Sequence, residues 1–282
     1  MKIVVTGAKG RIGSYTADYA RQQGHTVLGV DHIGLGNVTD YLSADLTDLG
    51  QVYDALYGAD AVVNLAAFPT QRNVPSAKLF TTNTAITWNV FEAASKLGIK
   101  RVVFASTIQM TRSVTLRNDI TYPYFPIDEA QPVDPQEDYS MSKRVGEVLG
   151  DMFSKHYGLT VVSLRFTAVA MPEAMATYPL PAAKPPHWAM YAYVDVRDAA
   201  RCAYLAATAP LPDHSHTRAF VVAKDTLVNT PSKEIVAQYF PAAEIRGPFD
   251  GYASLISGET AKTVLGFEAQ YSCRNDSWRE GL

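Results

Sequence analysis

The sequence predicts an α/β protein, because short apolar segments of strand length alternate with helical patterns and a glycine-rich turn directly follows the first segment. Such alternation is typical of repeated βαβ units, which build a parallel sheet covered by helices on both faces. A glycine-rich turn after the first strand is a feature of Rossmann-type sheets. We therefore expect a Rossmann-type doubly wound parallel sheet with a small C-terminal lobe.

The predicted elements follow one another in a regular order. Five apolar segments are expected to form strands: residues 2–6, 26–30, 61–66, 101–106 and 160–166. Helices are expected at residues 11–23, 49–57, 84–97 and 139–157. The stretch 171–188 is rich in proline, which argues against a continuous helix or a central strand, so a loop is expected there.

Composition excludes several classes of function. The 282 residues are 47% hydrophobic and 19% charged, enough to bury a sizeable core as one large domain or two unequal lobes. A net charge of -3 with scattered basic residues gives no support for a nucleic-acid partner. No apolar run approaches membrane-spanning length and no signal-peptide pattern is present, so we expect a cytoplasmic protein without a membrane partner. Neither Cys202 nor Cys273 has metal-ligand or redox spacing, and no metal site is expected.

The glycine-rich turn is a candidate phosphate cradle. Gly7 permits the tight strand-to-helix turn, Gly10 lets backbone amides approach phosphate oxygens, and Gly13 lets the helix pack closely on the sheet. Arg11 and Ile12 begin the helix, whose N-terminus then faces the anion. The turn is predicted to bind a dinucleotide; a purely structural turn is the alternative.

Asp31 ends the second strand-like segment, where a carboxylate can accept hydrogen bonds from the adenosine ribose hydroxyls. It would repel a 2′-phosphate, so NAD is favoured over NADP. Lys9, Arg11 and His32 partly offset that repulsion. The alternative role for Asp31 is that of a turn residue at the end of a strand.

A second motif lies far downstream. Tyr139 and Lys143 stand four residues apart on a predicted helix, where the ammonium can lower the pKa of the phenol. Such a tyrosine can act as the general acid/base beside a nicotinamide ring. An ordinary surface pair is the alternative, but the glycine-rich turn makes a nicotinamide enzyme the better interpretation.

Several motifs together resemble the extended short-chain dehydrogenase/reductase family, the NAD-dependent epimerase/dehydratase group. They are the glycine-rich turn, Asp45-Leu46, residues 64–67, Asn83, Asn89, Ser106-Thr107, Glu129, the Tyr139 and Lys143 pair, and residues 193–200. The resemblance covers nearly the whole chain. It implies hydride transfer at a hydroxyl carbon with NAD as cofactor, and a homodimer formed through the helices at 84–97 and 139–157.

The resemblance also implies roles for single residues. Asp45 and Leu46 are expected against the adenine, and the cofactor's central portion is expected to contact Leu65, Ala66, Ala67 and Asn83. Lys143 would bind the nicotinamide ribose. The third catalytic residue would be Thr107, whose hydroxyl can hold the reacting oxygen, with Ser106 as the fallback.

The substrate side departs from the nucleotide-sugar enzymes of this family. Their strand after the catalytic helix continues with Asn and Gly where this chain has Ala168 and Met171, which weakens the case for a nucleotide sugar. We therefore expect a free sugar or sugar acid, as in uronate dehydrogenases. The residues expected to contact it are Phe68, Gln109, Arg165, Thr167 and Trp188. Arg165 could equally form a structural ion pair, and Phe68 and Trp188 could serve packing alone.

This interpretation divides the chain into two parts. Residues 1–170, with 193–223 returning to them, are predicted to form the NAD-binding domain, and residues 171–192 and 224–282 a smaller substrate-binding lobe. The proline-rich loop would lie over the site.

Three functions stay open at this point. A dehydrogenase would release NADH, whereas a nucleotide-sugar epimerase or dehydratase would reverse the oxidation on the bound substrate. A non-catalytic dinucleotide sensor on the same fold is the third possibility.

Overall fold

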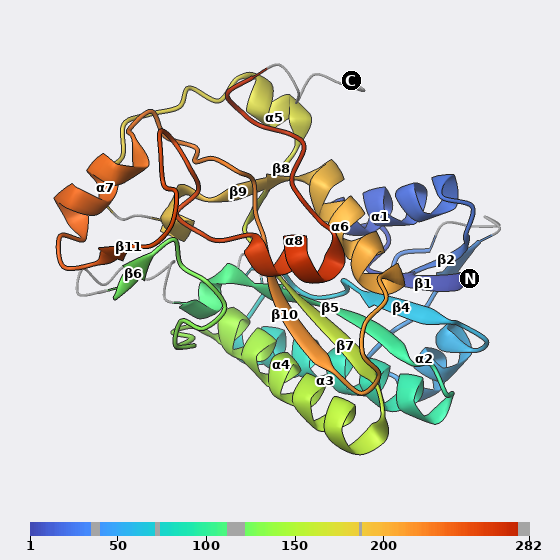
Figure 1. Cartoon of the computed structure of the whole chain (residues 1–282). Coiled ribbons are helices and arrows are strands. Elements are labelled where there is room, and N and C mark those ends of the chain that lie inside the picture. The colour runs from blue at the N-terminus through green and yellow to red at the C-terminus, as the bar shows by residue number, and fades with distance from the viewer. Residues whose placement is uncertain (35–39, 71–73, 112–121, 186–187, 276–282) are drawn as a thin grey trace.

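A computed structural model describes residues 1–34, 40–70, 74–111, 122–185 and 188–275, except the side chains of Ala176 and Trp188. Its centre is a parallel sheet of seven strands in the order β10-β7-β5-β4-β1-β2-β3 (Figure 1). The strands are β1 (Lys2–Thr6), β2 (Thr26–Asp31), β3 (Tyr41–Ser43), β4 (Ala61–Asn64), β5 (Arg101–Thr107), β7 (Thr160–Phe166) and β10 (His216–Val221). The order reverses between β1 and β4, which confirms the predicted doubly wound sheet.

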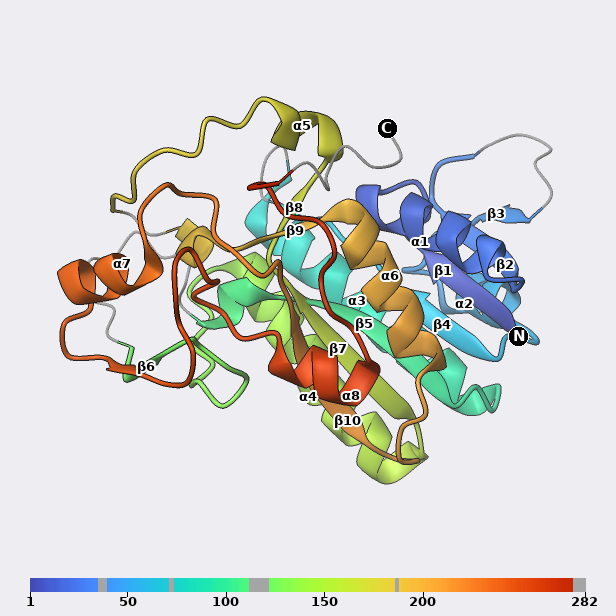
Figure 2. The ribbon, with the colours of Figure 1, turned by 45° about the horizontal axis from the view of Figure 1, so that its top comes forward.

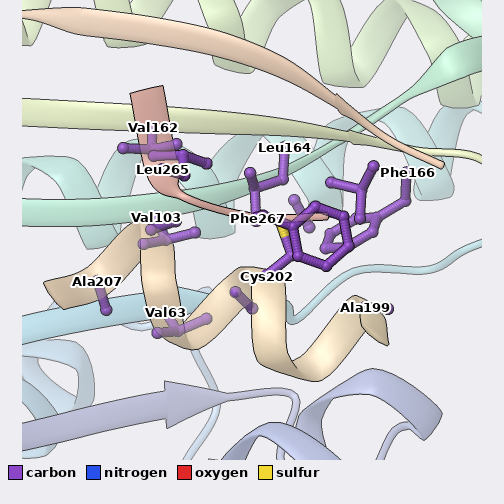
Figure 3. Close-up of a cluster of buried hydrophobic side chains, with 14 of the residues drawn as sticks. Val63, Val103, Val162, Leu164, Phe166, Ala199, Cys202, Ala207, Leu265 and Phe267 are labelled. Atoms are coloured by element: carbon purple, nitrogen blue, oxygen red, sulfur yellow. The ribbon is translucent and has the colours of Figure 1, made fainter. Parts of the chain in front are cut away.

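Helices cover both faces of this sheet (Figure 1). One face carries α1 (Arg11–Gln22), α6 (Val196–Thr208) and α8 (Glu259–Leu265), and the other carries α2 (Leu49–Leu56), α3 (Ser76–Lys96) and α4 (Asp138–Tyr157). Side chains alternate along each strand, so Ile3 and Val5 enter the first core and Val4 the second. Figure 3 shows the first core, which includes Val103 and Val162 of the sheet and Cys202 of α6.

A smaller group of elements lies at one end of the molecule, beyond the carboxyl ends of the strands (Figures 1 and 2). It contains β6 (Tyr124–Phe125), β11 (Glu244–Ile245), the short helix η2 (Trp188–Tyr191) and α7 (Ser232–Tyr239). Its apolar core joins Phe125, Met190 and Phe249 to Ile108. Ile108 begins the short helix η1 (Ile108–Thr111), so this core reaches the residue that follows β5.

The division into a cofactor domain and a substrate-binding lobe stays a prediction, with two observations bearing on it. Residues 122–127 join the core of the smaller group, although they precede residue 170. Conversely, Ala261 and Leu265 of α8 pack into the core of the large sheet, although they follow residue 224.

Most predicted boundaries agree within one residue, and the exceptions have local causes. β4 ends at Asn64 because the amides of Leu65 and Ala66 donate to the Thr6 hydroxyl (both 3.2 Å) and not to a strand. α3 starts at Ser76, after Pro75, eight residues before the predicted start.

The remaining differences are short elements that apolar periodicity did not reveal. The proline-rich stretch contains a helix, α5 (Pro172–Ala176), which begins on a proline because the missing amide hydrogen costs nothing in a first turn. Two strands, β8 (Ala168–Ala170) and β9 (Tyr193–Asp195), pair beside it. None of the helices in the described ranges has the length and apolarity needed to cross a membrane.

Candidate active site

The glycine-rich turn packs too tightly for side chains. A Cβ on Gly13 would lie 2.1 Å from the Gly7 carbonyl oxygen, and one on Gly7, whose φ is +66°, would lie 2.8 Å from the Ala66 nitrogen. α1 begins directly after Gly10 and has neither a side-chain cap nor an acidic residue in its first turn. Its first amides, which include those of Arg11 and Ile12, therefore have no intrahelical acceptor. Such a helix start suits an anion, so the turn fits a dinucleotide pyrophosphate.

Asp31 lies beside this turn at the end of β2. Its Oδ2 accepts from the Lys9 amide (3.0 Å), and its Oδ1 accepts from the amide of His32 (2.8 Å). The Asp31 carboxylate is 10% exposed, and the His32 ring lies 2.9 Å from it. Asp31 therefore stabilises the turn, and it is placed next to the helix start that would receive the pyrophosphate.

The segment after β4 is held from α3. Asn83 is buried, with its Oδ1 accepting from the Phe68 amide (2.8 Å) and its Nδ2 donating to the Phe68 carbonyl (3.1 Å) and the Ser142 hydroxyl (3.3 Å). These bonds anchor the segment to α3 at Phe68. Contacts of the cofactor with Leu65, Ala66, Ala67 and Asn83 stay predictions.

The predicted adenine-side residues have local partners of their own. Asp45 Oδ1 accepts from the amide (2.9 Å) and the hydroxyl (2.8 Å) of Thr47. Leu46 is buried in the second core, and its carbonyl accepts from Asn89 (3.0 Å).

The catalytic candidates meet where β5 ends and α4 begins. The Thr107 hydroxyl is hydrogen-bonded to the Tyr139 phenol. Lys143 is 4% exposed, and its Nζ lies 5.7 Å from the centre of the Tyr139 ring and 5.1 Å from that of Phe104. Glu137 caps the helix by accepting from the amides of Tyr139 (2.9 Å) and Ser140 (2.6 Å). Two elements thus bring a phenol, a hydroxyl and an amine together.

Burial sets the pKa values of Tyr139 and Lys143. Burial raises the pKa of Tyr139 to about 12; the Glu137 charge adds to this and the Thr107 hydrogen bond opposes it. Burial also lowers the pKa of Lys143 to about 7. Desolvation by burial therefore dominates the Tyr139 pKa, and a lowering of that pKa by Lys143 with bound NAD stays a prediction.

Ser106 takes a partner further along α4. Its hydroxyl is buried and donates to Oε1 of Glu147 (2.8 Å) on α4. Neighbouring residues of a strand point to opposite faces, so only one of Ser106 and Thr107 can face Tyr139. The structure selects Thr107.

Arg165 occupies the ion pair that the sequence analysis left open beside a substrate contact. Its guanidinium is 1% exposed and donates from Nε and Nη2 to Glu147 (both 2.9 Å), so Arg165 forms the structural ion pair that was the alternative. Thr167 is also buried and donates to the Val221 carbonyl (2.9 Å).

The other predicted substrate contacts stay predictions. The backbone amide of Gln109 donates to the Thr107 hydroxyl (3.2 Å), so Gln109 lies beside the catalytic candidates. Phe68 is partly buried. The side chain of Trp188 lies outside the described part of the chain.

Glu147 is the residue of this region that the sequence analysis missed. Its spacing in the sequence could have revealed it. Tyr139, Lys143 and Glu147 stand four residues apart and so share one face of α4. An acidic residue continuing a buried helical face needs a buried partner.

Comparisons with known proteins agree with this geometry. A model of the NAD dependent epimerase/dehydratase family matches residues 3–223. An L-arabinose 1-dehydrogenase (NAD(P)(+)) of Haloferax volcanii is 34% identical over 176 residues, which are 58% of this chain and 65% of that protein. A uronate dehydrogenase of Pseudomonas syringae is 27% identical over 169 residues (58% of each chain), and a putative UDP-glucose 4-epimerase of Methanocaldococcus jannaschii is 27% identical over 176 residues (59% and 55%).

These matches span less than two thirds of the relatives' length. Among solved structures, a short-chain dehydrogenase/reductase superfamily protein from Agrobacterium tumefaciens with bound NAD has a TM-score of 0.77 at 22% identity, covering 99% of this chain and 95% of that one. At this identity the likeness shows the fold.

Proposed function

Because the chain belongs to the NAD-dependent epimerase/dehydratase family, we propose that it is an NAD-dependent oxidoreductase acting at a hydroxyl carbon of a sugar or sugar acid. The observation that carries this proposal is the hydrogen bond between Thr107 and Tyr139 with Lys143 beside the ring. These residues lie at the carboxyl ends of the parallel strands, where ligands of such sheets bind.

The residues that would contact the cofactor favour NAD. The start of α1 would hold the pyrophosphate, Asp31 the adenosine ribose, and Lys143 the nicotinamide ribose. Bound NAD supplies the acceptor for a hydride, or its donor in the reverse direction. Because NAD is held inside the cell, its use also supports the cytoplasmic location expected from the sequence.

Tyr139 is the proton carrier in this proposal. With a pKa of about 12 the phenol is protonated at neutral pH and is ready to donate to a substrate carbonyl oxygen. In the oxidative direction it must accept a proton from the substrate hydroxyl, which requires positive charge nearby to lower its pKa. Lys143 can supply that charge, because a phenolate beside it favours its protonated form. Thr107 orients the reacting oxygen.

A free sugar or sugar acid is the substrate that we propose. Support comes from Ala168 and Met171, which replace the residues typical of nucleotide-sugar enzymes, and from relatives named for L-arabinose and uronate. The burial of Arg165 removes one cation from the candidates for carboxylate binding. Sugar-nucleotide epimerisation is the second candidate, favoured by the similarity to UDP-glucose 4-epimerases.

One experiment distinguishes these functions. Purified protein with NAD is offered free sugars, aldonates and uronates, and then UDP-sugars, with NADH absorbance and product chromatography as readouts. Net NADH from a free sugar or sugar acid is the expected result. A converted UDP-sugar without NADH accumulation would establish the epimerase, and NAD binding without conversion of any compound would favour a sensor.

A homodimer is part of the proposal. Exposed apolar side chains gather on α3 and α4, the two helices that the family resemblance assigns to a two-fold interface. Trp88 is 43% exposed, Met141 42%, Val148 49% and Tyr157 48%. A symmetric partner would bury the same patch from both subunits.

A further inference from the structure

We infer that Ser106 and Glu147 are positioning residues: their hydrogen bond fixes α4 against β5 and thereby sets Thr107 against Tyr139. The inference rests on the proposed function, since it assigns a role in the same reaction. Neither residue touches the phenol, so both act through their neighbours.

Glu147 connects one helix to three adjacent strands. Its side chain is fully buried and accepts from Ser106 of β5 (2.8 Å), from Arg165 of β7 (2.9 Å) and from Nε of Arg218 of β10 (3.0 Å). Ser106 and Arg165 are direct neighbours in the sheet register. A slide or rotation of α4 would break contacts with all three strands together.

The helix lies unusually close to β5 at this point. A Cβ on Gly146 would lie 2.2 Å from Cζ of Phe104, so only glycine permits this approach. Phe104 and Ser106 point from β5 to the same face, toward α4. The close contact leaves α4 little freedom to shift while the Glu147 bonds persist.

Two links between the same pair of elements form a closed frame. Ser106 binds Glu147, and the next residue, Thr107, binds Tyr139 at the start of the same helix. The helical segment from Tyr139 to Glu147 is about 12 Å long and hydrogen-bonded throughout, so it transmits a displacement at one end to the other. Loss of the Ser106 link would therefore loosen the geometry of Thr107 and Tyr139.

The charges around Glu147 show which of its hydrogen bonds a substitution can remove without breaking an ion pair. The group contains two carboxylates, Glu147 and Asp151, and two guanidiniums, Arg165 and Arg218, with Arg218 also bonded to Asp151 (2.5 Å). Burial raises the pKa of Glu147, but the hydrogen bonds and charge of Arg165 outweigh it and the net shift is downward. Ser106 is the uncharged donor, so Ser106→Ala leaves every ion pair in place.

Ser163 provides a matched control. Its hydroxyl lies 2.7 Å from Nε2 of His216, whose Nδ1 lies 2.9 Å from Asp151. This is the order of a hydrolase triad, but Ser163 is fully buried in the middle of β7, so no substrate reaches its hydroxyl. Ser163→Ala removes a buried hydroxyl bond from the same sheet without touching the Ser106–Glu147 link.

The test compares Ser106→Ala and Ser163→Ala by steady-state kinetics, NAD binding and amide hydrogen exchange. Ser106→Ala is expected to lower kcat by about tenfold or more while KM and the Kd for NAD change by less than about twofold. It should also speed exchange in residues 107–111 and 139–143. Ser106→Thr, which keeps the hydroxyl, should restore kcat, and Ser163→Ala should leave kcat and these amides unchanged.

Unchanged kcat in Ser106→Ala, or an equal loss in Ser163→Ala, overturns the inference. If the unmodified protein converts no sugar, the proposed function fails, and hydrogen exchange decides the inference separately. In that case equal exchange in the two alanine variants overturns it.

Discussion

The Thr107 hydroxyl, at the last position of β5, is hydrogen-bonded to the Tyr139 phenol in the first turn of α4. The neighbouring Ser106 points to the other face of the strand and binds Glu147. A single position along β5 thus separates a residue that touches the proton carrier from one that supports it.

Tyr139→Phe removes the phenolic proton and should lower kcat by about 10²- to 10⁴-fold, because the variant has no group to exchange a proton with the substrate oxygen. NAD binding should persist. Steady-state kinetics and NAD titration measure the two effects, and Tyr157→Phe, an exposed change on the same helix, is the control. Turnover equal to that of the unmodified protein would contradict the assignment of Tyr139.

Lys143→Met should stabilise the protein at neutral and acidic pH while abolishing activity. The pKa of Lys143 is about 7 in the folded protein, whereas its ordinary value of 10.5 applies to the unfolded chain. Between pH 7 and pH 10.5 the unfolded chain therefore binds more protons than the folded protein. The contribution of Lys143 to stability therefore rises with pH across this window, and its burial is most destabilising below pH 7. Denaturant unfolding from pH 6 to 10.5 measures the free energy of unfolding of both proteins. The excess stability of Lys143→Met should decrease above about pH 7.

The control for that series is Lys155→Met, on the exposed side of the same helix. The difference in unfolding free energy between Lys155→Met and the unmodified protein should not change with pH in this way. A constant difference between Lys143→Met and the unmodified protein across the window would show that Lys143 is not desolvated.

Asp31→Asn should shift cofactor preference toward NADP. The change removes the negative charge that repels a 2′-phosphate, and an effect of about 1.4 kcal/mol would raise the NADP to NAD ratio of kcat/KM by about tenfold. Initial rates with each cofactor test this, with Asp18→Asn on the exposed part of α1 as the control. An unchanged ratio would leave Asp31 as a residue that only stabilises the turn.

Arg165→Met should act on stability and not on substrate binding. The change leaves the Glu147 carboxylate buried without its bidentate partner, which costs about 3–5 kcal/mol of unfolding free energy. At a temperature where the variant is folded, KM for the substrate should stay within about twofold. A large rise in KM with unchanged stability would restore the substrate role.

Val148→Glu should convert the proposed homodimer into a monomer, because each copy would place a charge in an apolar interface. Analytical ultracentrifugation gives the mass directly. Tyr57→Glu is the control, since Tyr57 is 74% exposed and lies outside α3 and α4, at the end of α2. A dimer that survives Val148→Glu would place the interface elsewhere.

Regular patterns in the sequence predicted the regular parts of the fold. The large strands and the glycine-rich turn lie where they were expected, because apolar periodicity and glycine placement act within a few residues. β3 and the short strands outside the main sheet were missed, since two or three residues carry no detectable period. The earlier start of α3 was missed as well, because Leu79 is the one buried apolar side chain in residues 76–83, and a single residue shows no helical period.

By itself the sequence determined the fold class, the place of the glycine-rich turn and the spacing of Tyr139 and Lys143, because each depends on local geometry. Only the tertiary structure decided that Thr107 faces Tyr139 and that Arg165 belongs to Glu147. The physical reason is that a buried polar group takes the partner that helix and strand packing bring to it. Desolvation, which sets the pKa values of Tyr139 and Lys143, likewise depends on the whole surrounding fold.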